Sequence, residues 1–301
     1  MIQQVLEPAL CSPKPGWDYG QAFCRNLGLV SEAEQEQLRT ARVAIVGMGG
    51  VGGIHLVTLA RSGIGRFTIA DFDTFELANF NRQYGAMIDT IGRPKTEVMS
   101  EEVRRINPDV DLRVLDEGVQ SETIDEFLQD VDVLIDGIDY FAIDMRRRLY
   151  RRAAELGIRA IMAGPMGYSA AWLVFDPQGM PFDRYFDFRD DQSELEQLIA
   201  FTLGLAPAGL HAPYIDLNYV NFVEKYGPSA GLACNLCAGV AAVETLKLLL
   251  NRGRVRFVPK YAQFDVHRGI LRQRTLYGGN RHPWQRVKRS WLKRRFAAAI
   301  D

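Results

Sequence analysis

The chain has 301 residues, of which 47% are hydrophobic and 24% are charged, and its formal net charge is −1. These values are typical of a globular protein with one large or two modest domains, and the near-zero charge gives no overall attraction to nucleic acid or membrane. No run approaches the roughly 20 apolar residues of a membrane span, and the N-terminus lacks the pattern of a signal peptide. Because four cysteines do not make a disulfide framework, we expect a cytoplasmic protein.

Residues 1–30 are predicted to form an N-terminal arm that begins with an irregular, proline-containing leader. Ser31 is a good helix N-cap, and Glu34 three residues later completes a capping box. The helix that starts there is predicted to run to about Thr40 and to lead into the first strand. Arg25 lies within the arm, and its local sequence alone indicates an exposed surface charge.

The next stretch indicates a nucleotide-binding turn. Residues 43–46 are a short apolar, β-branched run that is typical of a buried parallel strand. Gly47, Gly49 and Gly52 form G-x-G-x-x-G directly after it, and residues 54–60 are predicted to be helical. Glycines permit a tight turn and close approach of the backbone, and the N-terminus of the helix offers free N–H groups to a phosphate.

A second strand, predicted over residues 67–70, ends on Asp71, and Asp73 follows two residues later. Both acids therefore lie at the carboxyl edge of the predicted sheet, where open α/β sheets bind their ligands. An acid at this position can hold the hydroxyls of a ribose. The glycine motif and Asp71 alone fit a dinucleotide and ATP equally well.

Further polar residues favour recognition of ribose and phosphate. Asn79, Arg82 and Gln83 have the i, i+3, i+4 spacing of residues on one face of a short helix. Lys95 is predicted to start another helix, which continues to about Ile106. A cation at the N-terminus of a helix is electrostatically unfavourable unless an anion joins it, so Lys95 favours a ligand role.

The rest of the first half alternates between strands and helices. Strands are predicted over residues 110–114, 131–135 and 160–163, and helices over 121–128 and 142–155. This alternation predicts a Rossmann-like, doubly wound and mostly parallel sheet. Asp136 and Asp139 follow the strand at 131–135, where they are either ligands for the Mg²⁺ of a nucleotide or ordinary loop and cap residues.

The second half is less regular. After a strand at 172–175, residues 176–230 are predicted to be an irregular insertion that covers the substrate rather than filling the core. Residues 231–280 are predicted to complete the core with a long buried helix and a hairpin that extends the sheet. Residues 281–301 form a basic amphipathic tail, whose helix either docks through Trp284 and Trp291 or contacts RNA, an acidic partner or a membrane surface.

Cys234 and Cys237 form the one C-x-x-C pair of the sequence. A structural zinc site requires four ligands, which usually come from two such pairs. The small, apolar residues around the pair favour packing in the core, because free cysteine behaves as a small hydrophobic residue. We therefore expect no structural zinc, with redox or nucleophilic roles as the alternatives.

Together, the glycine motif at 47–52, Asp71-x-Asp73, Asn79-x-x-Arg82-Gln83, Lys95 and Ile138-Asp139 resemble the ubiquitin-activating-enzyme-like adenylyltransferases. This superfamily (ThiF, MoeB and HesA types) includes the bacterial enzymes that activate sulfur-carrier proteins for thiamine and molybdopterin synthesis. The resemblance covers roughly residues 22–175 and resumes around 231–250. It implies that residues 31–175 form an ATP-binding adenylation core.

The resemblance also implies roles for individual residues. It implies ATP binding by the glycine loop and the polar residues near it, namely Gly47, Gly49, Gly50, Gly52, Asp71, Asp73, Asn79 and Gln83. It implies catalytic roles for Arg82, Lys95, the Mg²⁺-binding acid Asp139, and Arg25. The family sends the arginine that Arg25 matches across a homodimer interface into the ATP site of the partner, which reverses the interpretation of Arg25 as a surface charge.

The implied activity is the ATP- and Mg²⁺-dependent adenylation of a carboxylate, such as the C-terminus of a small ubiquitin-like protein, a sulfur carrier or a peptide. Such a reaction needs positioning and cationic charge on phosphate oxygens rather than a nucleophilic side chain. The sequence departs from the sulfur-carrier-activating members, which usually carry two C-x-x-C zinc pairs. Residues 176–230 also contain no cysteine, whereas members that transfer to a thiol keep their nucleophile there. We therefore expect adenylation without a thioester.

Other functions stay open. The sequence motifs at 62–65, 95–99 and 106–108 also resemble the branch of this superfamily that cyclises threonylcarbamoyladenosine in tRNA. The basic tail is compatible with contact with tRNA. The glycine motif and Asp71 alone permit an NAD-dependent oxidoreductase. A catalytically idle, nucleotide-sensing subunit is a further alternative.

Overall fold

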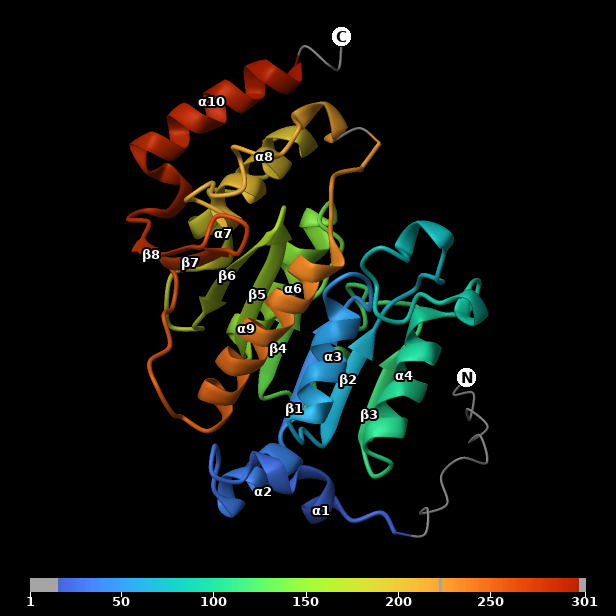
Figure 1. Cartoon of the computed structure of the whole chain (residues 1–301). Coiled ribbons are helices and arrows are strands. Elements are labelled where there is room, and N and C mark those ends of the chain that lie inside the picture. Colours follow the sequence, from blue (N-terminus) through green and yellow to red (C-terminus); the bar gives the residue numbers. More distant parts are fainter. Residues whose placement is uncertain (1–15, 222–223, 298–301) are drawn as a thin grey trace.

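The computed structural model describes residues 16–221 and 224–297, so most of the predicted leader lies outside the described residues. One eight-stranded sheet forms its centre, in the order β3-β2-β1-β4-β5-β6-β7-β8 (Figure 1). Pairs from β3 to β5 are parallel, whereas β6, β7 and β8 extend the sheet in antiparallel fashion. The strands are β1 Arg42–Val46, β2 Arg66–Ala70, β3 Asp111–Leu115, β4 Val133–Asp136, β5 Arg159–Met166, β6 Ser169–Phe175, β7 Lys260–Asp265 and β8 Ile270–Thr275. The predicted fold is confirmed.

Helices cover both faces of this sheet. The helices are α1 Tyr19–Phe23, α2 Glu32–Thr40, α3 Gly52–Arg61, α4 Lys95–Ile106, α5 Ile124–Phe127, α6 Ile143–Glu155, α7 Phe182–Phe186, α8 Glu194–Leu205, α9 Gly231–Leu249 and α10 Pro283–Ala297. Short 3₁₀ helices lie at Cys24–Asn26, Leu77–Asn79, Ile88–Thr90, Leu217–Tyr219 and Gly279–Arg281. Side chains of α3, α4 and α9 pack on one face of the sheet, and those of α5 to α8 pack on the other.

Local sequence explains how the chain enters the sheet. The Ser31 hydroxyl accepts a hydrogen bond from the backbone N–H of Glu34, whose carboxylate in turn accepts one from the N–H of Ser31. The predicted capping box is therefore confirmed. In β1, Val43 and Ile45 face the α3 side, while Ala44 and Val46 face the α6 side. Both faces are buried, as an apolar run without alternation predicts.

The prediction that residues 176–230 are an irregular insertion was wrong for their first half. Two helices, α7 and α8, form there and contribute Phe182, Phe186 and Phe201 to the core on the α6 side of the sheet. A capping box at Ser193 and Glu196 starts α8. Because these aromatic residues pack against the sheet, this part of the predicted insertion fills the core rather than only covering a substrate.

The C-terminal helix forms as predicted, but it docks through a different face. Trp284 and Trp291 are 70% and 56% exposed. The buried contacts come from Gln285, which donates to the carbonyl of Leu203, and from Arg289. The prediction of docking through tryptophans was therefore wrong, because α8 offers α10 polar backbone and acidic partners rather than an apolar groove.

Helix α9 is the one described helix that is long and apolar enough, by length and composition alone, to cross a membrane. In the fold it packs against β5, β6 and α3 (Figure 1). Cys234 and Cys237 are both buried within it, as the packing interpretation predicted. Cys24 is exposed far from this pair, and Cys11 lies outside the described residues.

Candidate functional site

The glycine loop follows β1 at the carboxyl edge of the sheet and leads into α3. Gly47 has a positive φ of 84°, and a Cβ on it would lie 2.2 Å from the carbonyl oxygen of Gly137. A Cβ on Gly52 would lie 1.6 Å from the carbonyl oxygen of Gly47. No larger residue fits at either position, so the loop folds tightly under the first turn of α3. This arrangement leaves the N-terminal N–H groups of α3 facing the edge, where an anion is favoured.

Asp71 fixes the glycine loop to the end of β2. Its carboxylate accepts hydrogen bonds from the backbone N–H groups of Met48, at 2.5 Å, and of Asp73, at 2.8 Å. The side chain is buried. The carboxylate oxygens retain lone pairs for a further donor, so the predicted contact with ribose hydroxyls is compatible with this structural role.

Lys95 is a buried cation at the first residue of α4. It is only 5% exposed, and its Nζ donates to Oδ2 of Asp73 at 2.9 Å. The backbone N–H of Lys95 also donates to the carbonyl oxygen of Asp73. Asp73 itself is 52% exposed, so solvent and ligands can reach the pair from its side. Lys95 thus places a positive charge next to Asp73, whose backbone N–H donates to the same Asp71 carboxylate that holds the glycine loop.

Arg82 and Gln83 lie over the glycine loop. A Cβ on Gly50 would be 3.7 Å from Cδ of Arg82, and one on Gly49 would be 3.7 Å from Nε2 of Gln83. The Arg82 guanidinium donates to the carbonyl oxygen of Ala78 at 2.9 Å. Buried Oε1 of Gln83 has no hydrogen-bond partner, and such an orphaned polar atom is rare in a folded protein. A ligand over the loop would satisfy it.

Asn79 is buried, and its side chain forms a hydrogen bond within the turn that contains it. Its Oδ1 accepts a hydrogen bond from the backbone N–H of Glu76 at 3.1 Å. The polar stretch forms a 3₁₀ helix and a following turn rather than the predicted short helix, and the N–H groups of Arg82 and Gln83 both donate to the carbonyl oxygen of Asn79. The turn brings Arg82 and Gln83 to the loop, and Asn79 holds the turn.

The loop after β4 separates the two candidate acids. Asp136 is buried and pairs with Arg146 at 2.8 Å, so it belongs to the core. Asp139 is exposed at the same edge as the glycine loop, and its Oδ2 accepts one long hydrogen bond, from the N–H of Phe141 at 3.4 Å. An accessible carboxylate of this kind suits a hard divalent cation. The shift from Asp136 to Asp139 that the family resemblance implied therefore agrees with their environments.

Arg146 is a residue that sequence reasoning missed. Besides Asp136, it donates to the carbonyl oxygens of Ile138, at 2.7 Å, and of Asp139, at 3.1 Å. Its guanidinium also lies 4.5 Å from the centre of the Phe201 ring. Arg146 therefore ties the loop that carries Asp139 to the core. In the sequence it was one of several basic residues on the helix at 142–155, with no signal that set it apart.

Cys234, in the first turn of α9, completes the wall of the site. Its Sγ would lie 3.4 Å from a Cβ on Gly50, and Arg82 is close enough to influence it electrostatically. Burial nevertheless raises the pKa of this thiol to about 11. The thiol is thus protonated at neutral pH and packs against the loop. No local sequence pattern indicates this contact, because it joins residues far apart in the chain.

Arg25 does not reach the glycine loop of its own chain. It is exposed in the 3₁₀ helix Cys24–Asn26, where the side chain of Asn26 donates to the carbonyl of Ser62 at the C-terminal end of α3. The glycine loop lies at the other end of α3, whose 10 residues span about 15 Å. Of the predicted site residues, Arg25 is the one that the fold places at the opposite end of the molecule.

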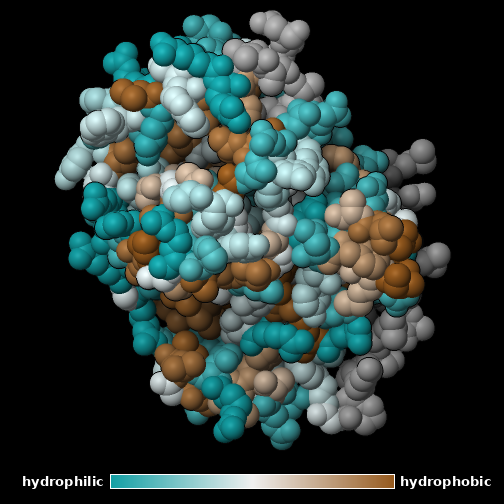
Figure 2. All heavy atoms as spheres, turned by 45° about the horizontal axis from the view of Figure 1, so that its top comes forward, coloured by the Kyte–Doolittle hydropathy of each residue, from teal (hydrophilic) through white to brown (hydrophobic). Residues whose placement is uncertain are grey.

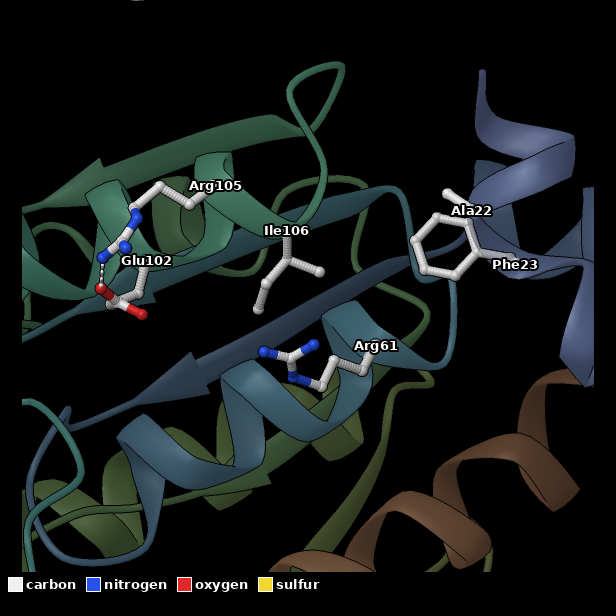
Figure 3. A pocket seen from close by; sticks show the side chains of 6 residues that line it. All are labelled: Ala22, Phe23, Arg61, Glu102, Arg105 and Ile106. Atoms are coloured by element: carbon white, nitrogen blue, oxygen red, sulfur yellow. Dashed lines mark hydrogen bonds and ion pairs between the residues drawn. The ribbon is translucent and has the colours of Figure 1, made fainter. Parts of the chain in front are cut away.

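A surface hollow lies near that opposite end, between α1, α3 and α4. Figure 3 shows the six residues that line it: Ala22, Phe23, Arg61, Glu102, Arg105 and Ile106. Arg105 is paired with Glu102. The hollow is thus separate from the carboxyl edge of the sheet, and the predicted nucleotide-binding residues lie elsewhere.

Comparisons with known proteins identify a family and a common fold. The model of the ThiF family matches residues 23–285. The chain is 44% identical over 123 residues to tRNA threonylcarbamoyladenosine dehydratase of Haemophilus influenzae, a match that spans 40% of this chain and 47% of the relative. The chain thus spans about half the length of that curated relative.

Two further proteins match over more of the chain. Molybdopterin-synthase adenylyltransferase of Haemophilus influenzae is 29% identical over 212 residues, which are 70% of this chain and 83% of the relative. A crystal structure of Escherichia coli MccB with ATP superposes with a TM-score of 0.64 at 18% identity, covering 90% of this chain and 74% of that chain. At that identity the superposition shows a common fold.

Proposed function

Because the chain belongs to the ThiF family, we propose that it activates a carboxylate by adenylation, at the expense of ATP and with release of pyrophosphate. The carboxylate that we propose is the C-terminus of a small ubiquitin-like protein, a sulfur carrier or a peptide. The molybdopterin-synthase adenylyltransferase is a relative of this adenylating type. We place the reaction in the cytoplasm, with a homodimer as the working unit.

One observation carries the proposal: two cations and one buried polar atom without a partner gather at a loop whose backbone favours an anion. The orphaned Oε1 of Gln83 and the half-buried side chain of Arg82 border the glycine loop. The buried ammonium of Lys95 is linked to the same loop through Asp73 and Asp71. A dinucleotide oxidoreductase needs the glycine loop and the acid after β2, but it has no need of two cations beside them. Phosphate chemistry needs both.

Each residue then has a role in the proposed reaction. The glycine loop and the start of α3 hold the phosphates, and Asp71 holds the ribose. Arg82 and Lys95 stabilise the negative charge that grows on the α-phosphate oxygens while the carboxylate attacks. Asp139 would hold the Mg²⁺ that accompanies ATP, which supplies further positive charge. No side chain serves as a nucleophile, so no covalent enzyme intermediate is required.

Arg25 enters the proposal through the homodimer. Because it lies exposed at the end of the chain's own α3 that is remote from the loop, it can act only in a second copy. A mixed dimer of an Arg25→Ala chain and a Lys95→Ala chain tests this role. If Arg25 acts across the interface, one site of this dimer contains both Arg25 and Lys95, and the other site contains neither. The mixed dimer should therefore keep about half of the wild-type activity. Loss of all activity would contradict action across the interface.

ATP–pyrophosphate exchange tests the adenylation itself. The probe is a synthetic peptide that ends in Gly-Gly with a free carboxylate, and the matched control is the same peptide with a C-terminal amide. We expect exchange only with the free acid. Arg82→Ala and Lys95→Ala should abolish it, whereas Arg93→Ala, which removes an exposed arginine paired with Glu97 and Glu101, should not. A Lys95→Ala enzyme with full activity would remove our assignment of that residue.

A second candidate substrate is tRNA that carries threonylcarbamoyladenosine. The relative with 44% identity is named for this reaction, and its match spans 123 residues, or 40%, of this chain. The same exchange assay with such a tRNA separates the two candidates. Exchange with tRNA but not with the peptide would favour the dehydratase. Absence of exchange with both, together with binding of NADH, would reject adenylation.

A further inference from the structure

The outer face of α10 combines basic and aromatic side chains. Residues 281–296 contain seven arginines and lysines and no acid. Three of them serve the inner face: Arg289 pairs with Asp187, Lys293 pairs with Glu196, and Lys288 donates to the carbonyl of Pro207. The exposed arginines of the outer face are Arg294 and Arg295, which lie three and four positions after Trp291.

Two tryptophans lie on the same outer face. Trp284 is 70% exposed, Trp291 is 56% exposed, and Val287 between them is 59% exposed. The tryptophans are seven positions apart, which is about two turns or about 10 Å along the helix. Because the ion pairs of the inner face hold α10 against α8, these rings are held outward, and the described part of the chain does not bury them. Two exposed indoles on one face of a helix indicate an interaction surface.

We propose that the outer face of α10 (Trp284, Val287, Trp291, Arg294 and Arg295) binds single-stranded RNA. Every base has a flat face that can stack on an indole, and arginines neutralise the backbone between stacked bases. The gap of about 10 Å between the indoles corresponds to about three stacked-base spacings of ~3.4 Å. The inference does not depend on which carboxylate the enzyme activates.

The composition of the face favours RNA over a lipid surface. A helix that lies in a membrane interface needs a broad apolar face that can sink into the lipid. Here the apolar residue Phe296 is buried against the protein. Figure 2, in which the top of Figure 1 comes forward, shows mostly teal and pale residues over the upper surface where α10 lies, with little brown. Trp284, Val287 and Trp291 alone make a narrow stripe flanked by charge.

Fluorescence anisotropy of a labelled 20-nucleotide oligo(U) RNA, titrated with the full chain, tests the proposal. We expect binding that weakens steeply between 50 and 200 mM salt. Trp284→Ala and Trp291→Ala should each weaken binding about 10-fold, while Trp291→Phe, which keeps an aromatic ring, should retain most of it. Arg294→Ala with Arg295→Ala should lower the salt slope by about 1.4.

Matched controls come from the opposite end of the molecule. Trp17→Ala and Arg105→Ala remove an indole and a guanidinium near the hollow of Figure 3, and they should leave RNA binding unchanged. Equal urea midpoints for all variants would show that each is folded. An RNA affinity that is the same for the wild type and for the α10 variants would overturn the proposal. So would binding to vesicles of anionic phospholipid in place of RNA, or a Kd weaker than about 10⁻⁴ M at 50 mM salt.

Discussion

Replacing Arg146 by methionine should test how the loop that carries Asp139 is held. The side chains of Arg146 and Asp136 are 3% and 2% exposed, so the substitution leaves a carboxylate buried without its partner. Breaking a buried pair in this way costs about 3–5 kcal/mol. Part of the loss comes from the contact between the guanidinium and the Phe201 ring, at 4.5 Å. We therefore expect a large fall in the free energy of unfolding, measured by urea denaturation.

A double variant separates the buried charge from the lost packing. Asp136→Asn removes the charge, and its amide oxygen can still accept the hydrogen bond that the N–H of Ile138 donates to Asp136. Asp136→Asn with Arg146→Met should therefore be at least 2 kcal/mol more stable than Arg146→Met alone. Arg152→Met, on the same helix, breaks an exposed pair with Asp125 and should barely change the urea midpoint. A double variant no more stable than the single one would refute this reasoning.

Arg146 should also matter for activity without touching the substrate. Because it binds the carbonyls of Ile138 and Asp139, its loss frees the loop that presents the Asp139 carboxylate. We expect Arg146→Met to raise the Mg²⁺ concentration needed for half-maximal exchange more than it raises the KM for ATP. An unchanged Mg²⁺ requirement would mean that Arg146 contributes to stability alone.

Three further predictions concern the loop, the buried histidines and the C-terminal helix. Gly52→Ala should abolish ATP binding, measured by isothermal titration, because the new Cβ would overlap the Gly47 carbonyl. Burial lowers the pKa of His55 to about 3 and of His211 to about 4, so the unfolded chain binds protons that the folded one does not. The free energy of unfolding is therefore unaffected by these histidines above about pH 6.5 and decreases as the pH drops below that value. At pH 5 the decrease is about 2 kcal/mol for each histidine, which urea titrations at several pH values would measure. Asp187→Ala removes the partner of Arg289 and should speed tryptic cleavage within α10; an unchanged cleavage rate would show that other contacts suffice.

The sheet and the nucleotide loop could be predicted because their signals are local. An apolar run, three spaced glycines and an acid after the next strand lie within 29 residues, from Val43 to Asp71, and each has one structural meaning. Arg82 and Gln83 were also found from spacing. Although their turn is not the predicted helix, hydrogen bonds to the Asn79 carbonyl keep both side chains at the loop.

The remaining features depend on contacts between distant residues. Arg146 pairs with Asp136, only ten positions away in the sequence. The pair is buried, however, because Phe201 from a distant segment and the turn after β4 pack around it. The Cys234 contact with Gly50 joins residues 184 positions apart, from 234 − 50. The docked face of α10 was mispredicted because hydrophobicity favoured Trp284 and Trp291, whereas the surface of α8 offers acceptors and an acid. The start of α8 could have been predicted from the sequence, because Ser193 and Glu196 have the spacing of a capping box.

The mixed pairing of the sheet gives its carboxyl edge a length that the parallel half alone would not have. Because β6 and β7 run antiparallel, the turns Met166–Ser169 and Asp265–Ile270 both come to the edge that carries the glycine loop. Four strand spacings of about 4.8 Å separate β1 from β7, so about 20 Å of this edge lies between the glycine loop and the turn Asp265–Ile270. Residues this far apart, with no shared partner, contribute independently to the stability of a fold. Substitutions in the two turns are therefore expected to leave the geometry of the glycine loop unchanged.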